Sequence, residues 1–138
     1  VVLGKAEWMY REYEIALFAV GSMVKTAEEV RRKLKAKGYG VSLINARSVK
    51  PIDEEAVREA CREHVLIVTM EENVACGGYG EKVLDCMNRN GLLNQYCNIS
   101  LPDAYIEHGN VELLKQEIGL DAESITGKIL EILKGRNV

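Results

Sequence analysis

The chain contains 138 residues, of which 47% are hydrophobic and 28% are charged, and its formal net charge at pH 7 is −3. This length suits one domain, and the acidic balance lacks the excess of basic residues that a nucleic-acid-binding surface requires. No apolar run reaches the roughly 18 residues of a membrane-spanning helix, so the composition indicates a soluble globular domain without a membrane partner.

Short apolar runs alternate with amphipathic stretches along the chain. The apolar runs predict strands at 6–11, 15–20, 41–46, 64–70 and 96–101. The amphipathic stretches predict helices at 24–37, 54–63, 78–89, 111–118 and 122–134. This alternation predicts a three-layer α/β/α fold with a five-stranded, mostly parallel sheet, forming a single domain over residues 1–138.

The four cysteines are Cys61, Cys76, Cys86 and Cys97. None forms a C-x-x-C pair, and neither histidine lies at zinc-finger spacing from a cysteine pair. We therefore expect free, mostly buried thiols in a reducing compartment, and no metal site.

In a sheet of this kind, ligands bind outside the carboxyl ends of the parallel strands. The residues that fall at this edge in the predicted fold are Gly21, Ser22, Arg47, Lys50, Glu71, Glu72 and His108. The first two begin a predicted helix, and the N-terminus of a helix can hold an anion. The other five are polar groups that we expect at contacts with another domain or subunit, because they line this edge.

Residues 70–80 read MEENVACGGYG and follow a buried apolar run, as a phosphate-binding loop would. A dinucleotide fingerprint, however, has the spacing G-x-G-x-x-G directly after the strand, whereas six residues separate Met70 from Gly77 here. We favour a packing role, in which Gly77, Gly78 and Gly80 let the start of a helix approach its neighbour closely. A β-branched side chain at Gly78 should crowd that approach, and a positive φ there would disfavour it further.

The adjacent carboxylates of Glu71 and Glu72 raise the alternative of a general acid/base pair. Consecutive side chains usually point in different directions, so an interdomain or subunit contact is the simpler interpretation. His108 lies in a predicted loop and titrates near neutral pH, which suits acid–base work or a structural hydrogen bond. His64 lies at a predicted helix end, where it can interact with the helix dipole.

Four segments, taken in order, resemble a known family. They are ALFAVGSMV (16–24), INARSVKPID (44–53), LIVTMEENVACGGYG (66–80) and LPDAYIEHG (101–109). Together with GLDAE (119–123), they are similar to the C-terminal domain of the transketolase family of thiamine-diphosphate-dependent enzymes, and within it to the 1-deoxy-D-xylulose-5-phosphate synthases.

The resemblance implies a five-stranded sheet with one antiparallel strand, which we assign to 6–11. It implies that the parent enzyme joins a two-carbon unit from pyruvate to glyceraldehyde 3-phosphate with loss of CO2, for isoprenoid, thiamine and pyridoxal synthesis. Thiamine diphosphate and Mg²⁺ would lie in the preceding domains, with no cofactor, metal or catalytic residue on this chain.

The implied role of this chain is structural. It would support the N-terminal and middle domains of the same enzyme and contribute to a homodimer, in the bacterial cytoplasm or in a plastid. The sequence begins VVLGKAEWMY without a methionine, so we expect a C-terminal piece of a longer enzyme.

Two alternatives remain open at this stage. One is the C-terminal domain of a transketolase or of a 2-oxo-acid dehydrogenase beta subunit, although GLDAESI after LPD-(x3)-EHG favours the synthase. The other is a free-standing flavodoxin-like module that holds an anion at Gly21 and Ser22.

Overall fold

The computed structural model describes residues 5–47, 52–74, 78–102 and 121–135. The strands are β1 (Glu7–Tyr10), β2 (Glu14–Ala19), β3 (Val41–Asn45), β4 (His64–Val74) and β5 (Gln95–Pro102). The helices are α1 (Met23–Ala36), α2 (Glu54–Glu63), α3 (Tyr79–Arg89) and α5 (Ala122–Gly135). The predicted helix at 111–118 lies outside the described residues, and no described helix is both long and apolar enough to cross a membrane.

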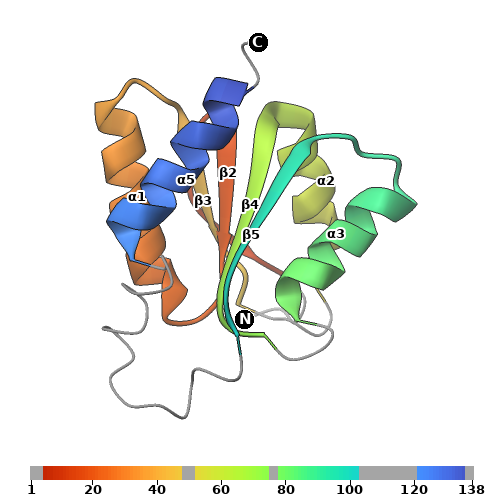
Figure 1. Ribbon diagram of the computed structural model, residues 1–138. Helices are drawn as coiled ribbons and strands as arrows, with labels where there is room; N and C mark the ends of the chain where they lie inside the picture. Colours follow the sequence, from red (N-terminus) through yellow and green to blue (C-terminus); the bar gives the residue numbers. More distant parts are fainter. Residues whose placement is uncertain (1–4, 48–51, 75–77, 103–120, 136–138) are drawn as a thin grey trace.

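The strands form one five-stranded sheet in the order β1-β3-β2-β4-β5 (Figure 1). β1 runs antiparallel to β3, and every other neighbouring pair is parallel. The prediction of a mostly parallel sheet whose first strand is antiparallel is therefore confirmed. From β2 the chain turns to one side to make β3 and then crosses to the other side to make β4, so the connections diverge between β2 and β4. Such a switch point is where open α/β sheets usually form their ligand crevice.

Helices cover both faces of the sheet. α1 and α5 lie on one face, and α2 and α3 lie on the other (Figure 1). Alternate residues of the central strands divide between the two cores: Leu17 faces α1 and α5, whereas Phe18 faces α2 and α3, and both are fully buried. Burial of each such side chain contributes about 1.5–3 kcal/mol, so the two cores together hold the layers on the sheet.

The predicted start of α2 and most of the predicted apolar stripe of α1 are confirmed. The sequence predicts Val24, Ala27, Val30 and Leu34 as this stripe; the last three are buried, whereas Val24 is partly buried and Met23 is buried instead. Asp53 caps α2, since its carboxylate accepts a hydrogen bond from the backbone N–H of Ala56 at 3.0 Å.

β4 is longer than the sequence predicts. The polar residues after Met70 suggested a loop, but the strand continues to Val74 because β5 continues beside it. Glu71 pairs with Ser100 and Val74 with Pro102. Backbone pairing with a neighbouring strand thus outweighs the low β-propensity of the segment EEN.

The turn between β1 and β2 is tightly constrained. Glu14 has a φ of 78°, and the N–H of Ile15 donates to the Tyr13 carbonyl at 3.1 Å, which is a γ-turn of the rare, strained kind. Gly40 packs directly against it, because a Cβ at Gly40 would lie 2.8 Å from the Tyr13 carbonyl oxygen.

We therefore expect Gly40→Ala to lower the free energy of unfolding by about 1–3 kcal/mol, since backbone must move to admit the methyl group. Gly127→Ala is the matched control: Gly127 lies inside α5, and no atom of the described residues lies within 4 Å of its Cβ position. That change should stabilise the chain by about 0.5–1 kcal/mol. Urea unfolding of both variants measures the difference, and equal effects would contradict the close approach at Gly40.

Candidate functional site

The carboxyl ends of the parallel strands bring several of the predicted site residues to one edge. Gly21 and Ser22 follow β2 directly, and Glu71 lies on β4 just beyond the last residue paired with β2. These three residues therefore border the switch point between β2 and β4. Arg47 lies one strand further away, after β3, next to β1.

The carboxylate of Glu71 occupies the N-terminus of α3. Its Oε1 accepts the backbone N–H of Tyr79 at 3.0 Å, and its Oε2 accepts the N–H of Gly80 at 2.7 Å. Glu71 is only 4% exposed, so these bonds form away from water. A helix N-terminus has unpaired N–H groups and a positive dipole end, and here a carboxylate from the neighbouring strand satisfies both. The anion at the N-terminus of α3 is therefore the Glu71 carboxylate, a group of the protein itself.

Gly80 is the glycine that makes this arrangement possible. A Cβ there would lie 2.5 Å from Asn98 Oδ1 and 2.8 Å from Glu71 Oε2, so a side chain at this position would force the Asn98 amide or the Glu71 carboxylate to move. The predicted packing role of the glycines is confirmed at this position. Gly78 is the N-cap of α3 with φ −64° and ψ 174°, so the condition of a positive φ, which would have disfavoured a β-branched residue further, is not met there. Gly77 lies outside the described residues.

Beneath α3, a polar network joins β4 to β5. Thr69 Oγ1 lies 2.7 Å from Tyr96 Oη and 2.9 Å from Asn98 Oδ1, and Tyr96 Oη donates to the Gly80 carbonyl at 2.8 Å. Burial raises the pKa of Tyr96 to about 12, so its hydroxyl stays protonated at neutral pH. The network therefore fixes the first turn of α3 on the sheet, and it leaves no base poised for proton transfer among these groups.

The N-terminus of α1 differs from that of α3. Ser22 is its N-cap residue but makes no capping hydrogen bond, and the first turn contains no acidic residue. Gly21 has a φ of 56°, and nothing lies within 4 Å of its Cβ position among the described residues. Of the two helix starts at the switch point, only this one lacks a carboxylate from the described chain.

The remaining predicted edge residues separate into three cases. Arg47 pairs with Glu7 of β1 at 2.9 Å, and both side chains are largely exposed. Glu72 follows Glu71 on β4 and is partly buried. Lys50 and His108 lie outside the described residues.

A second polar cluster lies at the opposite edge of the sheet, where the parallel strands begin. His64 Nδ1 is 2.7 Å from the Ala60 carbonyl oxygen in the last turn of α2, and its Nε2 is 2.7 Å from Ser42 Oγ. The predicted role of His64 at a helix end is confirmed. Ser42 was not predicted, and its signal was a single hydroxyl residue within the apolar strand VSLIN.

Glu12 connects this cluster to α1. Its carboxylate pairs with Arg31 and accepts a hydrogen bond from Lys35 at 2.7 Å. The Lys35 hydrogen bond lowers the pKa of the Glu12 carboxyl, and the charge of Arg31 lowers it further. Arg31 also donates to the Val41 carbonyl and lies over the Tyr10 ring, 3.7 Å from its centroid. Ion pairs from Glu12 to Arg31 and Lys35 thus connect the turn before β2 to α1.

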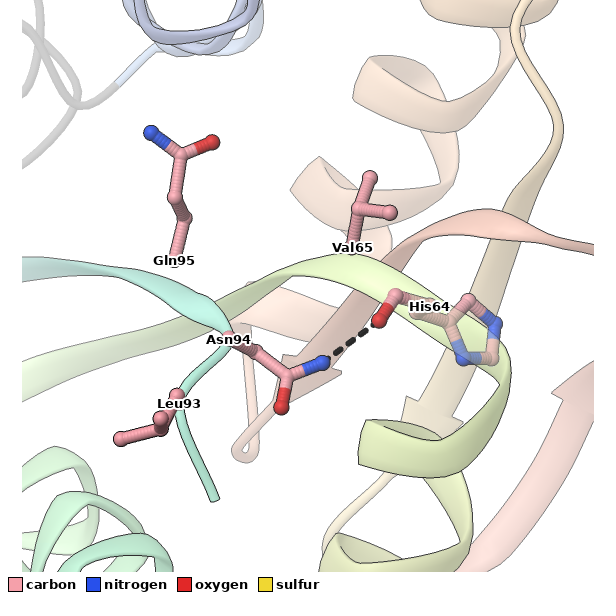
Figure 2. A pocket seen from close by; sticks show the side chains of 5 residues that line it. All are labelled: His64, Val65, Leu93, Asn94 and Gln95. Atoms are coloured by element: carbon pink, nitrogen blue, oxygen red, sulfur yellow. Dashed lines mark hydrogen bonds between the residues drawn. The ribbon is translucent and has the colours of Figure 1, made fainter. Parts of the chain in front are cut away.

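An open pocket of about 450 Å³ lies beside His64, at the start of β4 and β5. Figure 2 shows that Val65 and Gln95 extend to one side of the sheet, whereas the His64 ring turns away from them. Asn94 donates to the His64 carbonyl at 2.6 Å, which ties the loop after α3 to β4. Among the described residues, the pocket lining contains no carboxylate, hydroxyl or thiol, and we assign it no chemistry.

Metal and thiol chemistry find no support in the described residues. No group of three His, Cys, Asp or Glu side chains could hold a metal ion there. Cys61, Cys86 and Cys97 are free and buried, as predicted, and burial raises the pKa of the Cys61 thiol to about 11. Such thiols are protonated and poorly nucleophilic at neutral pH. Cys76 lies outside the described residues.

Fold and site together define the class of protein: a three-layer α/β domain whose glycine-rich helix start is closed by its own carboxylate. The chain belongs to the transketolase C-terminal domain family, which matches residues 4–125. This assignment confirms the resemblance seen in the sequence.

Among curated proteins, the chain is similar to 1-deoxy-D-xylulose-5-phosphate synthases. The chain is 46% identical over 130 residues to a 1-deoxy-D-xylulose-5-phosphate synthase of Lachnoclostridium phytofermentans, covering 94% of this chain and 21% of the relative. It is 34% identical over 135 residues to the synthase of Aquifex aeolicus, covering 98% of this chain and 22% of that protein. The chain thus spans about a fifth of the length of these relatives.

A solved structure has the same fold. The inactive beta4 tetramer of a split-gene transketolase superimposes with a TM-score of 0.86 and 24% sequence identity, covering 97% of this chain and 44% of that one. At this identity the likeness establishes the fold alone, and it agrees with the five-stranded mixed sheet.

Removal of the Glu71 carboxylate should destabilise the start of α3. We expect Glu71→Ala to lower the free energy of unfolding by about 2–4 kcal/mol, because two buried N–H groups lose their acceptor. Glu71→Gln keeps one acceptor oxygen and should cost less. Glu123→Gln, an exposed position in the first turn of α5, is the control and should change stability by less than about 0.5 kcal/mol. Urea unfolding decides, and equal costs for all three would refute the capping role.

The Glu12 pairs should give a pH-dependent contribution to stability. The carboxyl has a lower pKa in the folded than in the unfolded chain, so its stabilisation is complete above the unfolded value of about 4.3. It is lost as the pH falls through the folded value. Glu12→Gln should therefore be less stable than the unchanged chain at pH 7, with the difference shrinking below about pH 4. A constant difference in urea midpoints across this range would exclude the charge effect.

Proposed function

We propose that this chain is the C-terminal structural and dimerisation domain of a 1-deoxy-D-xylulose-5-phosphate synthase. The observation that carries the proposal is the similarity over 94% of the chain, at 46% identity, to a relative of that name. The parent protein then condenses pyruvate with glyceraldehyde 3-phosphate with loss of CO2, for isoprenoid, thiamine and pyridoxal synthesis. It acts in the bacterial cytoplasm or in a plastid.

Thiamine diphosphate and Mg²⁺ belong, on this proposal, to the other domains of the parent protein. Diphosphate binding requires free N–H groups or cations, and the N–H groups of Tyr79 and Gly80 at the glycine-rich start of α3 already bind Glu71. The described residues also contain no carboxylate cluster suited to Mg²⁺. The glycine-rich start of α3 therefore does not fit the diphosphate, and we assign the described residues no step of the reaction.

The carboxyl edge of the sheet is the surface that we propose to meet the preceding domains or the second subunit. Arg47, Lys50, Glu71, Glu72 and His108 are the residues predicted for these contacts. Within the described residues, Arg47 has an exposed guanidinium that its pairing with Glu7 leaves partly in solvent. Glu71 would act indirectly, by holding α3 in place, since its oxygens already accept bonds within the chain.

A second candidate function keeps the open helix start at Gly21 and Ser22 as an anion site in a free-standing module. The uncapped N-terminus of α1 at the switch point supports it. The similarity to relatives about five times longer favours the structural role instead.

A thermal-shift screen separates the two. The panel is thiamine diphosphate with Mg²⁺, FMN, NAD, ATP and inorganic phosphate, each added to the 138-residue chain. A ligand at 100 times its Kd stabilises by about 2.7 kcal/mol, which is a shift of several degrees for a domain of this size. The structural role predicts no shift and no turnover of pyruvate.

The control variant is Ser22→Asp, which places a carboxylate at the start of α1 and should itself stabilise the helix. A phosphate shift that this variant abolishes would establish the anion site and favour the second candidate. A shift with thiamine diphosphate, or synthase activity of the chain alone, would overturn the structural role.

A further inference from the structure

Ser42 and His64 are buried polar residues that form a hydrogen bond with each other inside the domain. Ser42 lies on β3 and is fully buried, and His64 lies where α2 ends and β4 begins and is 4% exposed. Buried polar groups of this kind are expected to have all their hydrogen bonds satisfied in each charge state that they adopt.

The Ala60 carbonyl fixes the tautomer of His64. A carbonyl oxygen only accepts, so Nδ1, at 2.7 Å from it, carries a hydrogen whether the ring is neutral or protonated. The other nitrogen, Nε2, is then a bare acceptor in the neutral ring and an N–H donor in the cation. Ser42 Oγ, at 2.7 Å, must donate in the first case and accept in the second.

Ser42 has a second place for its hydrogen. Its Oγ accepts the backbone N–H of Glu12 at 2.7 Å and lies 3.1 Å from the Glu12 carbonyl oxygen. In the neutral state the single hydroxyl hydrogen points to His64, and the Glu12 carbonyl receives no bond from Ser42. When His64 is protonated, the same hydrogen is free to turn to that carbonyl. In both states the two ring nitrogens and the Ser42 hydroxyl are hydrogen-bonded, and the direction of the hydroxyl differs.

The charges around the ring come from several elements. Glu63, at the end of α2, interacts electrostatically with His64, and Glu14 of β2 lies opposite His64 in the strand register. The Trp8 ring of β1 lies 6.2 Å from the His64 ring, and the Arg11 guanidinium lies over the Trp8 ring. Ser42 on β3 and Asn94 before β5 face the histidine as neutral groups.

We propose that Ser42 and His64 make the hydrogen bonding of the turn between β1 and β2 depend on the protonation of His64. Uptake of one proton from solvent at His64 Nε2 reverses the Ser42 hydroxyl, which then donates to the Glu12 carbonyl. That carbonyl belongs to the turn whose side chains pair with α1 through Glu12 and with α2 through Arg11. The turn is thus held by one more hydrogen bond when His64 is charged.

The test is a nuclear magnetic resonance titration of the ¹⁵N-labelled 138-residue chain from about pH 8 to about pH 5. Long-range ¹H–¹⁵N spectra of the rings should show hydrogen on Nδ1 throughout and a titration at Nε2, with His108→Gln used for assignment. The amide of Tyr13, which reports on the Glu12 carbonyl, should shift with the same midpoint as His64.

Variants at Ser42 test whether the Tyr13 amide responds to His64 through the Ser42 hydroxyl. In Ser42→Ala, the Tyr13 amide should no longer follow His64, whereas Ser42→Thr keeps a hydroxyl and should preserve the coupling. The unchanged chain alone can overturn the proposal if the alanine variant does not fold. A neutral ring with hydrogen on Nε2, a His64 that does not titrate while the chain is folded, or a Tyr13 amide that ignores its titration would each do so.

Discussion

The carboxylate of Glu71 is the constraint on which the carboxyl end of the sheet depends. It leaves β4 on the face covered by α3 and binds two N–H groups of the first helical turn, at 3.0 and 2.7 Å. In this contact α3 lies so close to the sheet that a Cβ at position 80 would displace the Asn98 amide or the Glu71 carboxylate. The bond from Tyr96 to the Gly80 carbonyl then orients the same turn from β5. The contact between Glu71 and the first turn of α3 therefore explains why position 80 is a glycine: the short distance between helix and sheet leaves little room for a side chain there.

The two edges of the sheet use buried polar groups differently. At the amino edge, Ser42, His64 and Asn94 connect strands, a helix end and loops through backbone carbonyls. At the carboxyl edge, one helix start is closed by Glu71 and the other, at Ser22, has no capping side chain from the described residues. A helix dipole without a local partner favours an acidic or carbonyl group from elsewhere. This asymmetry supports the proposal that the carboxyl edge faces the rest of a longer protein.

The sequence predicts the periodic elements well because their signals are local. The apolar stripe of α1 and the N-cap at Asp53 lie within a few residues of the structure that they specify; the N-cap and three of the four stripe residues are confirmed, whereas Val24 is only partly buried. The extension of β4 to Val74 was missed because it depends on pairing with β5, about 30 residues further along the chain. The sequence predicts close packing at Gly77, Gly78 and Gly80 alike, since a pattern of glycines does not reveal which one meets a neighbouring side chain, and the structure shows such an approach at Gly80. The resemblance to a family supplied the antiparallel β1, which its short run EWMY alone could not specify.

The same reasoning explains why MEENVACGGYG looks like a nucleotide-binding loop and yet is closed. Glycines before a helix indicate only that backbone comes close to something, and the N–H groups that bind phosphate are equally suited to a carboxylate. Which of the two occupies the helix start depends on whether the preceding strand ends before the loop or carries an acidic residue under the helix. Here β4 runs on past Met70, and its next inward-facing residue is Glu71. The length of one strand, set by its pairing with β5, thus decides between a binding site and a structural cap.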